Sequence, residues 1–227
     1  MSEHTIRPVA HIESDFPEKF GIPRQALVVS ELRARVVFDG EYRNDEALRG
    51  IEGFSHLWLI WHFSASEREG WSPTVRPPRL GGNARMGVFA TRSPFRPNAL
   101  GLSCVRLLGT EKIAGKGTTL LVAGADLMDG TPIFDVKPYI PYADAHPEAA
   151  GGFAPDPGRT LEVVFAPGQE EKVPAEKRAA LRGVLANDPR PRYQDDPERV
   201  YAMSFAGLTV RFRAEGRTLC VTEVEKP

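Results

Sequence analysis

The sequence predicts a mainly β protein, in which a closed or nearly closed antiparallel sheet is followed by a small α+β subdomain. Over the first two-thirds of the 227 residues, short β-prone runs are separated by turns containing Gly and Pro, which is typical of antiparallel sheets. An Ala-, Gly- and Pro-rich segment at 146–158 then interrupts the chain. Beyond it the pattern changes to one helical stretch and several alternating runs, so we expect two units, 1–146 and 159–227.

The first unit contains most of the expected strands. Residues 32–38 alternate apolar and basic side chains, which predicts one buried and one exposed face. The run FSHLWLIWHF at 54–63 is apolar almost throughout, which predicts a strand buried on both faces. Asn44 and Asp45 are expected to cap a short helical turn, and Gly115-Lys116-Gly117 suits a hairpin connection. Further strands are expected at 7–13, 86–90, 100–108, 118–122 and 133–137.

The second unit has a different order of elements. A strand is expected at 160–165, and a helix at 174–187, where Pro174 suits the first turn and apolar residues recur at helical spacing. The sequence DPRPRY at 188–193 must end that helix, because proline removes a backbone donor and restricts the residue before it. A three-stranded antiparallel meander is then expected at 199–206, 208–214 and 218–224.

Composition excludes several classes of protein. The chain has 29 basic and 30 acidic residues, a net charge of -1, which argues against a protein that coats DNA generally. It contains no apolar run of membrane-spanning length, and its N-terminal residues lack the apolar core of a signal peptide. Cys104 and Cys220 are isolated, without metal-type spacing, so we expect a cytoplasmic protein with neither membrane span nor metal.

Positive charge is concentrated in one window. Residues 70–110 contain no Asp or Glu, and every basic residue among them is arginine. A guanidinium binds phosphate or carboxylate in a planar, bidentate manner that an ammonium group cannot match. The window therefore predicts a site for an anionic ligand or a nucleic acid, the alternative being a solvated loop with counter-ions. Its six arginines are Arg76, Arg79, Arg85, Arg92, Arg96 and Arg106.

Other motifs are less specific. The chain lacks the Gly-rich dinucleotide motif, a Walker A motif and the G-x-S-x-G elbow. Asp129-Gly130 predicts a turn that serves either as a plain hairpin or as a contact to a ribose or cation. Asp135 and Lys137 share a strand face, as an exposed charge pair or as a pair of site residues. The spacings of His11, His56 and His62 match no zinc pattern, and core or interface positions are favoured for His56, His62, Trp58 and Trp61.

Several stretches together resemble one known family. They are KFGIPRQ at 19–25, GIEGFSHLW at 50–58, the block TVRPPRLGGNARMGVFATRSPFRPNALGLS at 74–103, DLMDGTPIFDVKPYIPY at 126–142, and DPRPRY at 188–193. The chain resembles the TsaA/TrmO family of S-adenosylmethionine-dependent tRNA N6-methyltransferases over nearly its whole length. This implies a small antiparallel β-barrel methyltransferase domain, distinct from the Rossmann type, that works as a homodimer. The implied substrate is tRNA with N6-threonylcarbamoyladenosine beside the anticodon, and the C-terminal unit is expected to assist tRNA binding.

The resemblance also implies roles for individual residues. In the methyl transfer that the family carries out, a nearby carboxylate or an ordered water must take the N6 proton, and Asp135 is the candidate carboxylate, with Lys137 as its electrostatic partner. The four arginines expected to contact RNA phosphate or the threonyl carboxylate are Arg76, Arg79, Arg85 and Arg96. The implied contacts to S-adenosylmethionine are Pro23, Arg24, Gln25, Ser64, Ala65, Arg92, Leu102, Asp129, Gly130, Thr131 and Pro132.

Two other functions remain open from the residues alone. A non-catalytic RNA-binding barrel would use the arginines only for phosphate and would not bind S-adenosylmethionine. A metal-dependent hydrolase would instead recruit the histidines as metal ligands.

Overall fold

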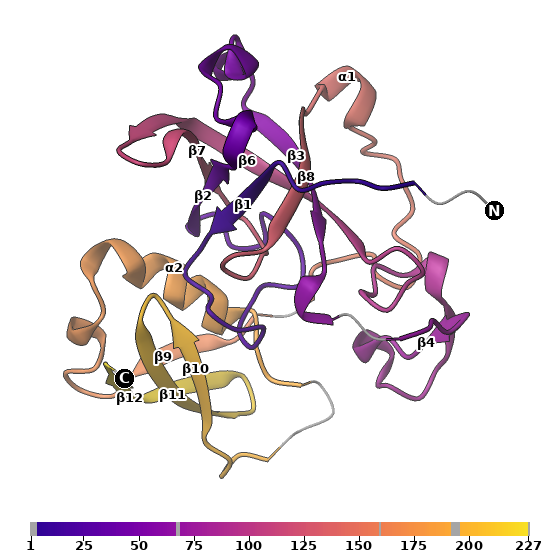
Figure 1. Cartoon of the computed structure of the whole chain (residues 1–227). Coiled ribbons are helices and arrows are strands. Elements are labelled where there is room, and N and C mark those ends of the chain that lie inside the picture. The colour runs from indigo at the N-terminus through magenta and orange to yellow at the C-terminus, as the bar shows by residue number, and fades with distance from the viewer. Residues whose placement is uncertain (1–3, 67–68, 159, 192–195, 227) are drawn as a thin grey trace.

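Six antiparallel strands form the N-terminal part of the computed structural model, which describes residues 4–66, 69–158, 160–191 and 196–226. Their order in the sheet is β1-β2-β7-β6-β3-β8, and β1 pairs with β8 as well as with β2, so the sheet closes on itself as a barrel (Figure 1). The mainly β prediction is therefore confirmed. The strands are β1 (Ala10–Glu13), β2 (Arg33–Phe38), β3 (His56–His62), β6 (Leu100–Ile113), β7 (Gly117–Ala123) and β8 (Pro132–Pro138).

The barrel interior is filled by alternate residues of these strands. In β3, Leu57, Leu59 and Trp61 are buried, whereas the residues between them are half-buried. The expectation that this strand is buried on both faces is wrong, because only one face of each barrel strand points inward and the residues on the outer face of β3 are only half-buried. Trp61 lies directly over Gly101 of β6, where a Cβ atom would come within 2.2 Å of the indole ring.

The connections contain short helices and one small ribbon. As expected, Asn44 caps a helical turn, since its side chain accepts a hydrogen bond of 3.0 Å from the amide of Glu46. The strand expected at 86–90 is wrong beyond residue 87, because a 3-10 helix replaces it at 88–90. These elements are β4 (Thr74–Val75), β5 (Met86–Gly87), α1 (Pro141–Asp144) and the 3-10 turns Gly40–Tyr42, Asp45–Leu48, Ile51–Gly53, Ser64–Ser66, Pro78–Leu80, Val88–Ala90 and Glu170–Lys172.

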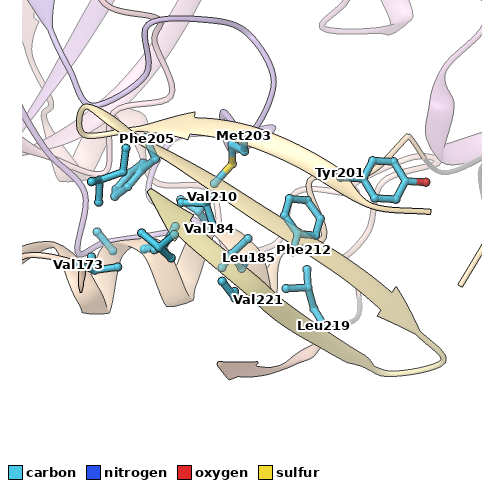
Figure 2. Packing of buried hydrophobic residues seen from close by; sticks show 14 of the residues in the cluster. Val173, Val184, Leu185, Tyr201, Met203, Phe205, Val210, Phe212, Leu219 and Val221 are labelled. Atoms are coloured by element: carbon cyan, nitrogen blue, oxygen red, sulfur yellow. The ribbon is translucent and has the colours of Figure 1, made fainter. Parts of the chain in front are cut away.

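The C-terminal part is a four-stranded sheet with one helix against it. The sheet order is β10-β11-β12-β9, and the last three strands in the chain form the expected antiparallel meander. The first strand, β9, pairs in parallel with β12. Side chains of the helix and the sheet interlock in a continuous apolar core (Figure 2). The elements are β9 (Glu162–Phe165), α2 (Ala175–Ala186), β10 (Tyr201–Phe205), β11 (Leu208–Glu215) and β12 (Thr218–Glu225).

The segment 14–32, which joins β1 to β2, packs into this C-terminal core rather than into the barrel. Phe16, Val29 and Leu32 are buried there, at 1–3% exposure. Two glycines make the approach close: a Cβ on Gly21 would lie 2.1 Å from the sulfur of Met203, and one on Gly183 of α2 would lie 2.6 Å from Val29. The expected boundaries of the two units, 1–146 and 159–227, stay a prediction. Segment 14–32 belongs to the first unit in sequence but packs in the core of the second.

The segment after α2 was expected to end that helix. The described part of DPRPRY, up to residue 191, follows the end of α2 as expected, while Arg192 and Tyr193 lie outside the described residues. Within the described ranges, none of the helices combines the length and the apolar character that crossing a bilayer requires.

The contact between Trp61 and Gly101 makes a prediction about stability. Gly101→Ala should destabilise the fold by about 1–3 kcal/mol, because the added methyl group must displace a buried indole. Thermal unfolding measures this as a lowered Tm. Gly87→Ala is the matched control, since Gly87 has φ −56° and nothing lies within 4 Å of its Cβ position. Equal Tm values for the two variants would contradict the described packing.

Candidate functional site

Antiparallel pairing places three long connections at the same rim of the barrel. Chain direction alternates between neighbouring strands, so the connections 14–32, 63–99 and 124–131 all leave from one end. The registers agree with this, because His62 pairs with Leu100, Arg33 with Ala123, and Trp61 with Ile133. Every residue implied to contact the cofactor belongs to these connections, except Leu102 and Pro132, which lie within the first three residues of the adjoining strands.

The first two connections meet through an exposed arginine. Arg92 donates a hydrogen bond from Nη1 to Oε1 of Gln25, and Gln25 in turn donates to the carbonyl of Arg24. Arg24 donates to the carbonyl of Arg190 in the C-terminal unit, at 3.5 Å. Pro23 is buried, whereas the side chains of Arg24, Gln25 and Arg92 are exposed to solvent. The structure thus brings Pro23, Arg24, Gln25 and Arg92 together.

The same connections meet again at Ala65. Lys19 donates from Nζ to the Ala65 carbonyl at 2.5 Å, and its Nζ lies 3.5 Å from Oγ of Ser66. Ser64 and Ala65 are both exposed, in the 3-10 turn that follows β3. A ligand at this point would therefore meet main-chain groups, a hydroxyl and the Lys19 ammonium group.

The third connection ends in a turn that is tied to the first. Oδ1 of Asp129 accepts from the amide of Ser14 at 2.9 Å, and the Asp129 amide donates to the carbonyl of Phe16 at 2.8 Å. The Gly130 amide donates to Ile12, and both the amide and the hydroxyl of Thr131 donate to Met128. The amides of these three residues therefore all donate within the protein, so the turn offers a ligand the Asp129 carboxylate rather than backbone N–H groups. Asp129 and Gly130 remain exposed, with Gly130 at φ +73°.

Leu102 and the candidate catalytic pair lie on the outer surface of the barrel. Ile60 of β3 pairs with Leu102 on one side and with Asp135 on the other, so the three side chains share a face. Leu102 is 55% exposed. Asp135 and Lys137 form an ion pair of 2.9 Å, and Oδ1 of Asp135 also accepts from the amide of Val136. The prediction that Asp135 and Lys137 share one face is confirmed.

The part of the acid-free window that precedes β6, residues 70–99, forms a loop beside the barrel that contains β4 and β5 (Figure 1). We call this loop the excursion. Its arginines are less isolated than their sequence suggests. Arg79 binds Asp156 of the segment between the two units, with Nη2 to Oδ1 at 2.8 Å and Nη1 to the backbone carbonyl. Arg85 donates to the Thr74 hydroxyl and Arg96 to the Thr91 carbonyl, both at 3.0 Å, while Arg76 is exposed.

One residue of the rim was missed by sequence reasoning. Asp126 lies at the start of the third connection, and its Oδ1 accepts a 2.6 Å hydrogen bond from the Ser103 hydroxyl. Ser103 accepts in turn from the indole Nε1 of Trp61 at 2.9 Å. Burial raises the pKa of Asp126 above its ordinary value, opposed by the Ser103 hydrogen bond and the charge of Arg92. The signal available in the sequence was an acidic residue placed directly after an apolar strand.

A cleft lined by both polar and apolar residues lies between the Asp129 turn and the C-terminal unit. Its volume is about 460 Å³, and Asp15 crosses it to bind Lys177 of α2 at 2.7 Å. The metal alternative has no support in the described part of the chain, where His, Cys, Asp and Glu nowhere gather in a group of three or more that could hold an ion.

Comparison with known proteins assigns both parts of the chain to one family. Residues 11–145 match the N-terminal domain of tRNA-methyltransferase O, and residues 158–227 match the C-terminal domain of TrmO. The tRNA (adenine(37)-N6)-methyltransferase of Escherichia coli (strain K12) is 42% identical over 223 residues, 94% of each chain. The protein of the same name from Eikenella corrodens is 51% identical over 164 residues, 71% of this chain and 92% of its own.

Solved structures agree with the sequence comparison. The crystal structure of TrmO from Pseudomonas aeruginosa superimposes with a TM-score of 0.82 at 32% identity, covering 99% of each chain. The similarity therefore includes the barrel, the C-terminal sheet and their arrangement.

The Arg79–Asp156 contact makes a prediction about local stability. Asp156→Asn should accelerate backbone amide exchange around residues 78–82 by about two- to fivefold, because an ion pair near the surface stabilises by about 0.2–1 kcal/mol. Hydrogen–deuterium exchange with mass spectrometry measures the effect. Glu148→Gln in the same segment is the control, since Glu148 has only a 3.6 Å contact to exposed His146. Equal exchange in both variants would show that the ion pair does not hold the excursion.

Proposed function

The chain belongs to the tRNA-methyltransferase O family, and from that premise we propose that it methylates N6 of N6-threonylcarbamoyladenosine 37 in tRNA. Family membership makes it an S-adenosylmethionine-dependent methyltransferase acting on adenosine 37 of tRNA. The observation that carries the proposal is the convergence, on one rim, of the three connections that hold the family's sequence motifs. We include the threonylcarbamoyl group in the proposed substrate because its carboxylate suits an arginine-rich surface.

The side chains at the rim fit the chemistry of S-adenosylmethionine, the cofactor for which relatives of this chain are named. When bound, it supplies a methyl group on a positively charged sulfur. Arg92 presents an exposed guanidinium, oriented by Gln25, that can bind the methionine carboxylate with both branches. The Asp129 carboxylate is exposed on the third connection of the same rim and can accept from ribose hydroxyls.

The remaining proposed contacts are supplied by backbone and apolar groups. Pro23 and Arg24 shape the first connection, and Ser64 and Ala65 offer main-chain groups at the end of β3. Leu102 contributes exposed apolar surface, and Gly130, Thr131 and Pro132 lie where the third connection enters β8. This cofactor site would be built from the loops of an antiparallel barrel, not from the Gly-rich strand-to-helix turn of a Rossmann domain.

Methyl transfer requires the N6 nitrogen to approach the methyl group in line with the breaking bond. Most of the rate acceleration would come from holding the two reactants in that geometry. The N6 nitrogen must also lose a proton, and Asp135 is our candidate acceptor, with its carboxylate held by the Lys137 ammonium at 2.9 Å. Both groups lie on the same barrel face as Leu102, so an adenine reaching past Leu102 would approach them.

The tRNA would be held by the excursion and by neighbouring surfaces. Arg76, Arg79, Arg85 and Arg96 lie in one acid-free segment whose Pro residues limit its conformations. We place RNA phosphate or the threonyl carboxylate against these arginines, and we assign the C-terminal unit an assisting role in tRNA binding. A homodimer working in the cytoplasm completes the proposal.

The direct test is nucleoside analysis of the reaction product. Purified protein, S-adenosylmethionine and threonylcarbamoylated tRNA are incubated with a chelator, and the tRNA is digested for mass spectrometry. The expected product is threonylcarbamoyladenosine carrying one additional methyl group. Binding of tRNA without uptake of S-adenosylmethionine would favour a non-catalytic RNA-binding barrel instead.

Arg92→Lys is expected to weaken S-adenosylmethionine binding roughly ten- to a hundredfold. The ammonium group cannot reproduce the two-branched contact, and charge-assisted hydrogen bonds contribute about 1.5–3 kcal/mol. Isothermal titration calorimetry measures the dissociation constant. Arg96→Lys serves as control, because Arg96 donates a hydrogen bond to the Thr91 carbonyl that lysine can replace. An unchanged constant for Arg92→Lys would reassign Arg92 to RNA binding or to structure.

Arg79→Ala is expected to weaken tRNA binding and to flatten its dependence on salt by about one unit, as the loss of one phosphate contact requires. Asp156→Asn is the opposing variant, because it releases the same guanidinium from its carboxylate partner and should strengthen binding. Affinities are measured at two salt concentrations, with both modified and unmodified tRNA. A loss confined to modified tRNA would assign Arg79 to the threonyl carboxylate, and no loss with either would make it purely structural.

A further inference from the structure

We propose that Trp71 and Phe89, two aromatic residues of the excursion, form a stacking platform for unpaired RNA bases. The proposal rests on the proposed function for the identity of the RNA, which would be the tRNA loop around adenosine 37. It adds contacts to bases, whereas the arginines of the excursion are placed against phosphate or carboxylate. Neither ring belongs to the contacts that the family resemblance implies.

The two rings contact each other on the protein surface. Their centroids are 6.3 Å apart and their planes are inclined by 34°, a separation typical of packed aromatic pairs. Trp71 is nonetheless 53% exposed and Phe89 72%, whereas Trp58 is half-buried and Trp61 is buried. Leaving two large rings in water forgoes the stabilisation that burial would give. Exposed apolar surface gathered in one place is typical of interaction sites.

A short ribbon and a 3-10 turn hold the rings in this position. β4 pairs with β5, and the Val88 amide donates to the Pro73 carbonyl at 2.9 Å. In the turn that follows, Val88 is 1% exposed, while the next side chain, Phe89, is left outside. The Thr91 amide and hydroxyl both donate to the Val88 carbonyl, at 3.1 and 2.8 Å. The outward position of Phe89 is therefore fixed by a hydrogen-bonded backbone.

Two guanidinium groups are held on the same ribbon and turn. Arg85 donates from Nη1 to the hydroxyl of Thr74 in β4, and Arg96 donates from Nη1 to the carbonyl of Thr91, where the 3-10 turn ends; both distances are 3.0 Å. Both acceptors are neutral oxygens, so these hydrogen bonds leave the two positive charges uncompensated. The rings therefore lie on a segment that also offers positive charge to phosphate.

The combination of exposed rings and arginines favours single-stranded RNA as the occupant. Each unpaired nucleotide brings a flat base that can stack on an aromatic side chain and a phosphate that an arginine can bind, whereas the bases of a duplex are already stacked. The family acts on adenosine 37 of tRNA, beside the anticodon, where bases are unpaired. In a symmetric pair of chains centred on this surface, the arginines of both copies would meet one another, which opposes a second copy as the occupant.

The test measures binding of the cofactor-free protein to two RNAs. One is a hairpin with the anticodon stem and its unpaired loop, and the other is a fully paired duplex of the same stem. Trp71→Ala and Phe89→Ala should each weaken hairpin binding about five- to a hundredfold, the range for one lost stacking contact, and leave duplex binding unchanged. Arg76→Ala should weaken binding of both RNAs, because both contain phosphate.

Two conservative variants separate base stacking from general apolar contact. Trp71→Phe keeps a flat aromatic face and should bind the hairpin nearly as tightly as the unaltered protein. Trp71→Leu keeps apolar surface without a flat ring and should bind as weakly as Trp71→Ala. Thermal unfolding should give all these variants the original Tm, since both rings lie on the surface.

Unchanged hairpin affinity in Trp71→Ala and Phe89→Ala, an equal loss with the duplex, or full affinity in Trp71→Leu would overturn the proposal. A change from dimer to monomer in Phe89→Ala, measured by analytical ultracentrifugation, would also overturn it and would assign the rings to a contact between two copies. Hairpin binding that depends on both rings, in a protein that does not methylate threonylcarbamoylated tRNA, would reject the proposed function alone.

Discussion

Closure of the antiparallel barrel is the constraint on which the site depends. With six strands alternating in direction, three connections must emerge at the same rim, whatever their sequences. These connections have little regular structure of their own, so the first two can approach one another closely enough for Arg92 to reach Gln25 and for Lys19 to reach Ala65. A rigid sheet thus supplies the geometry, and the loops supply the chemical groups.

The loop 14–32 has a second attachment that limits its freedom. Phe16, Val29 and Leu32 are buried in the C-terminal core, and Gly21 permits contact with Met203 that no other residue would allow. The residues between these anchors include Pro23, Arg24 and Gln25. The C-terminal unit therefore has a structural connection to the rim through packing, and the Arg24–Arg190 hydrogen bond adds a polar one.

Local patterns predicted the elements well, and the motifs expected to bind the cofactor lie on connections that share one rim. Alternation predicted β2 and the C-terminal meander, and the spacing of apolar residues predicted α2. The outward face of β3 was misjudged because an apolar run does not reveal whether both of its faces are covered. The Arg79–Asp156 pair joins residues 77 positions apart, and the Ser103–Asp126 hydrogen bond joins residues 23 positions apart. No local pattern records contacts of that range, and none shows that β9 pairs in parallel with β12.

The packing of segment 14–32 also sets an order of events during protein synthesis. The partners that bury Phe16 and Val29 lie at 173–224, so they leave the ribosome some 150 residues later. A nascent chain can complete all six barrel strands once residue 138 has emerged, yet its first connection still has no apolar surface to fold against. Maturation of the rim would then wait for the synthesis of residues 173–224, and the first connection would reach its finished packing only after they have emerged.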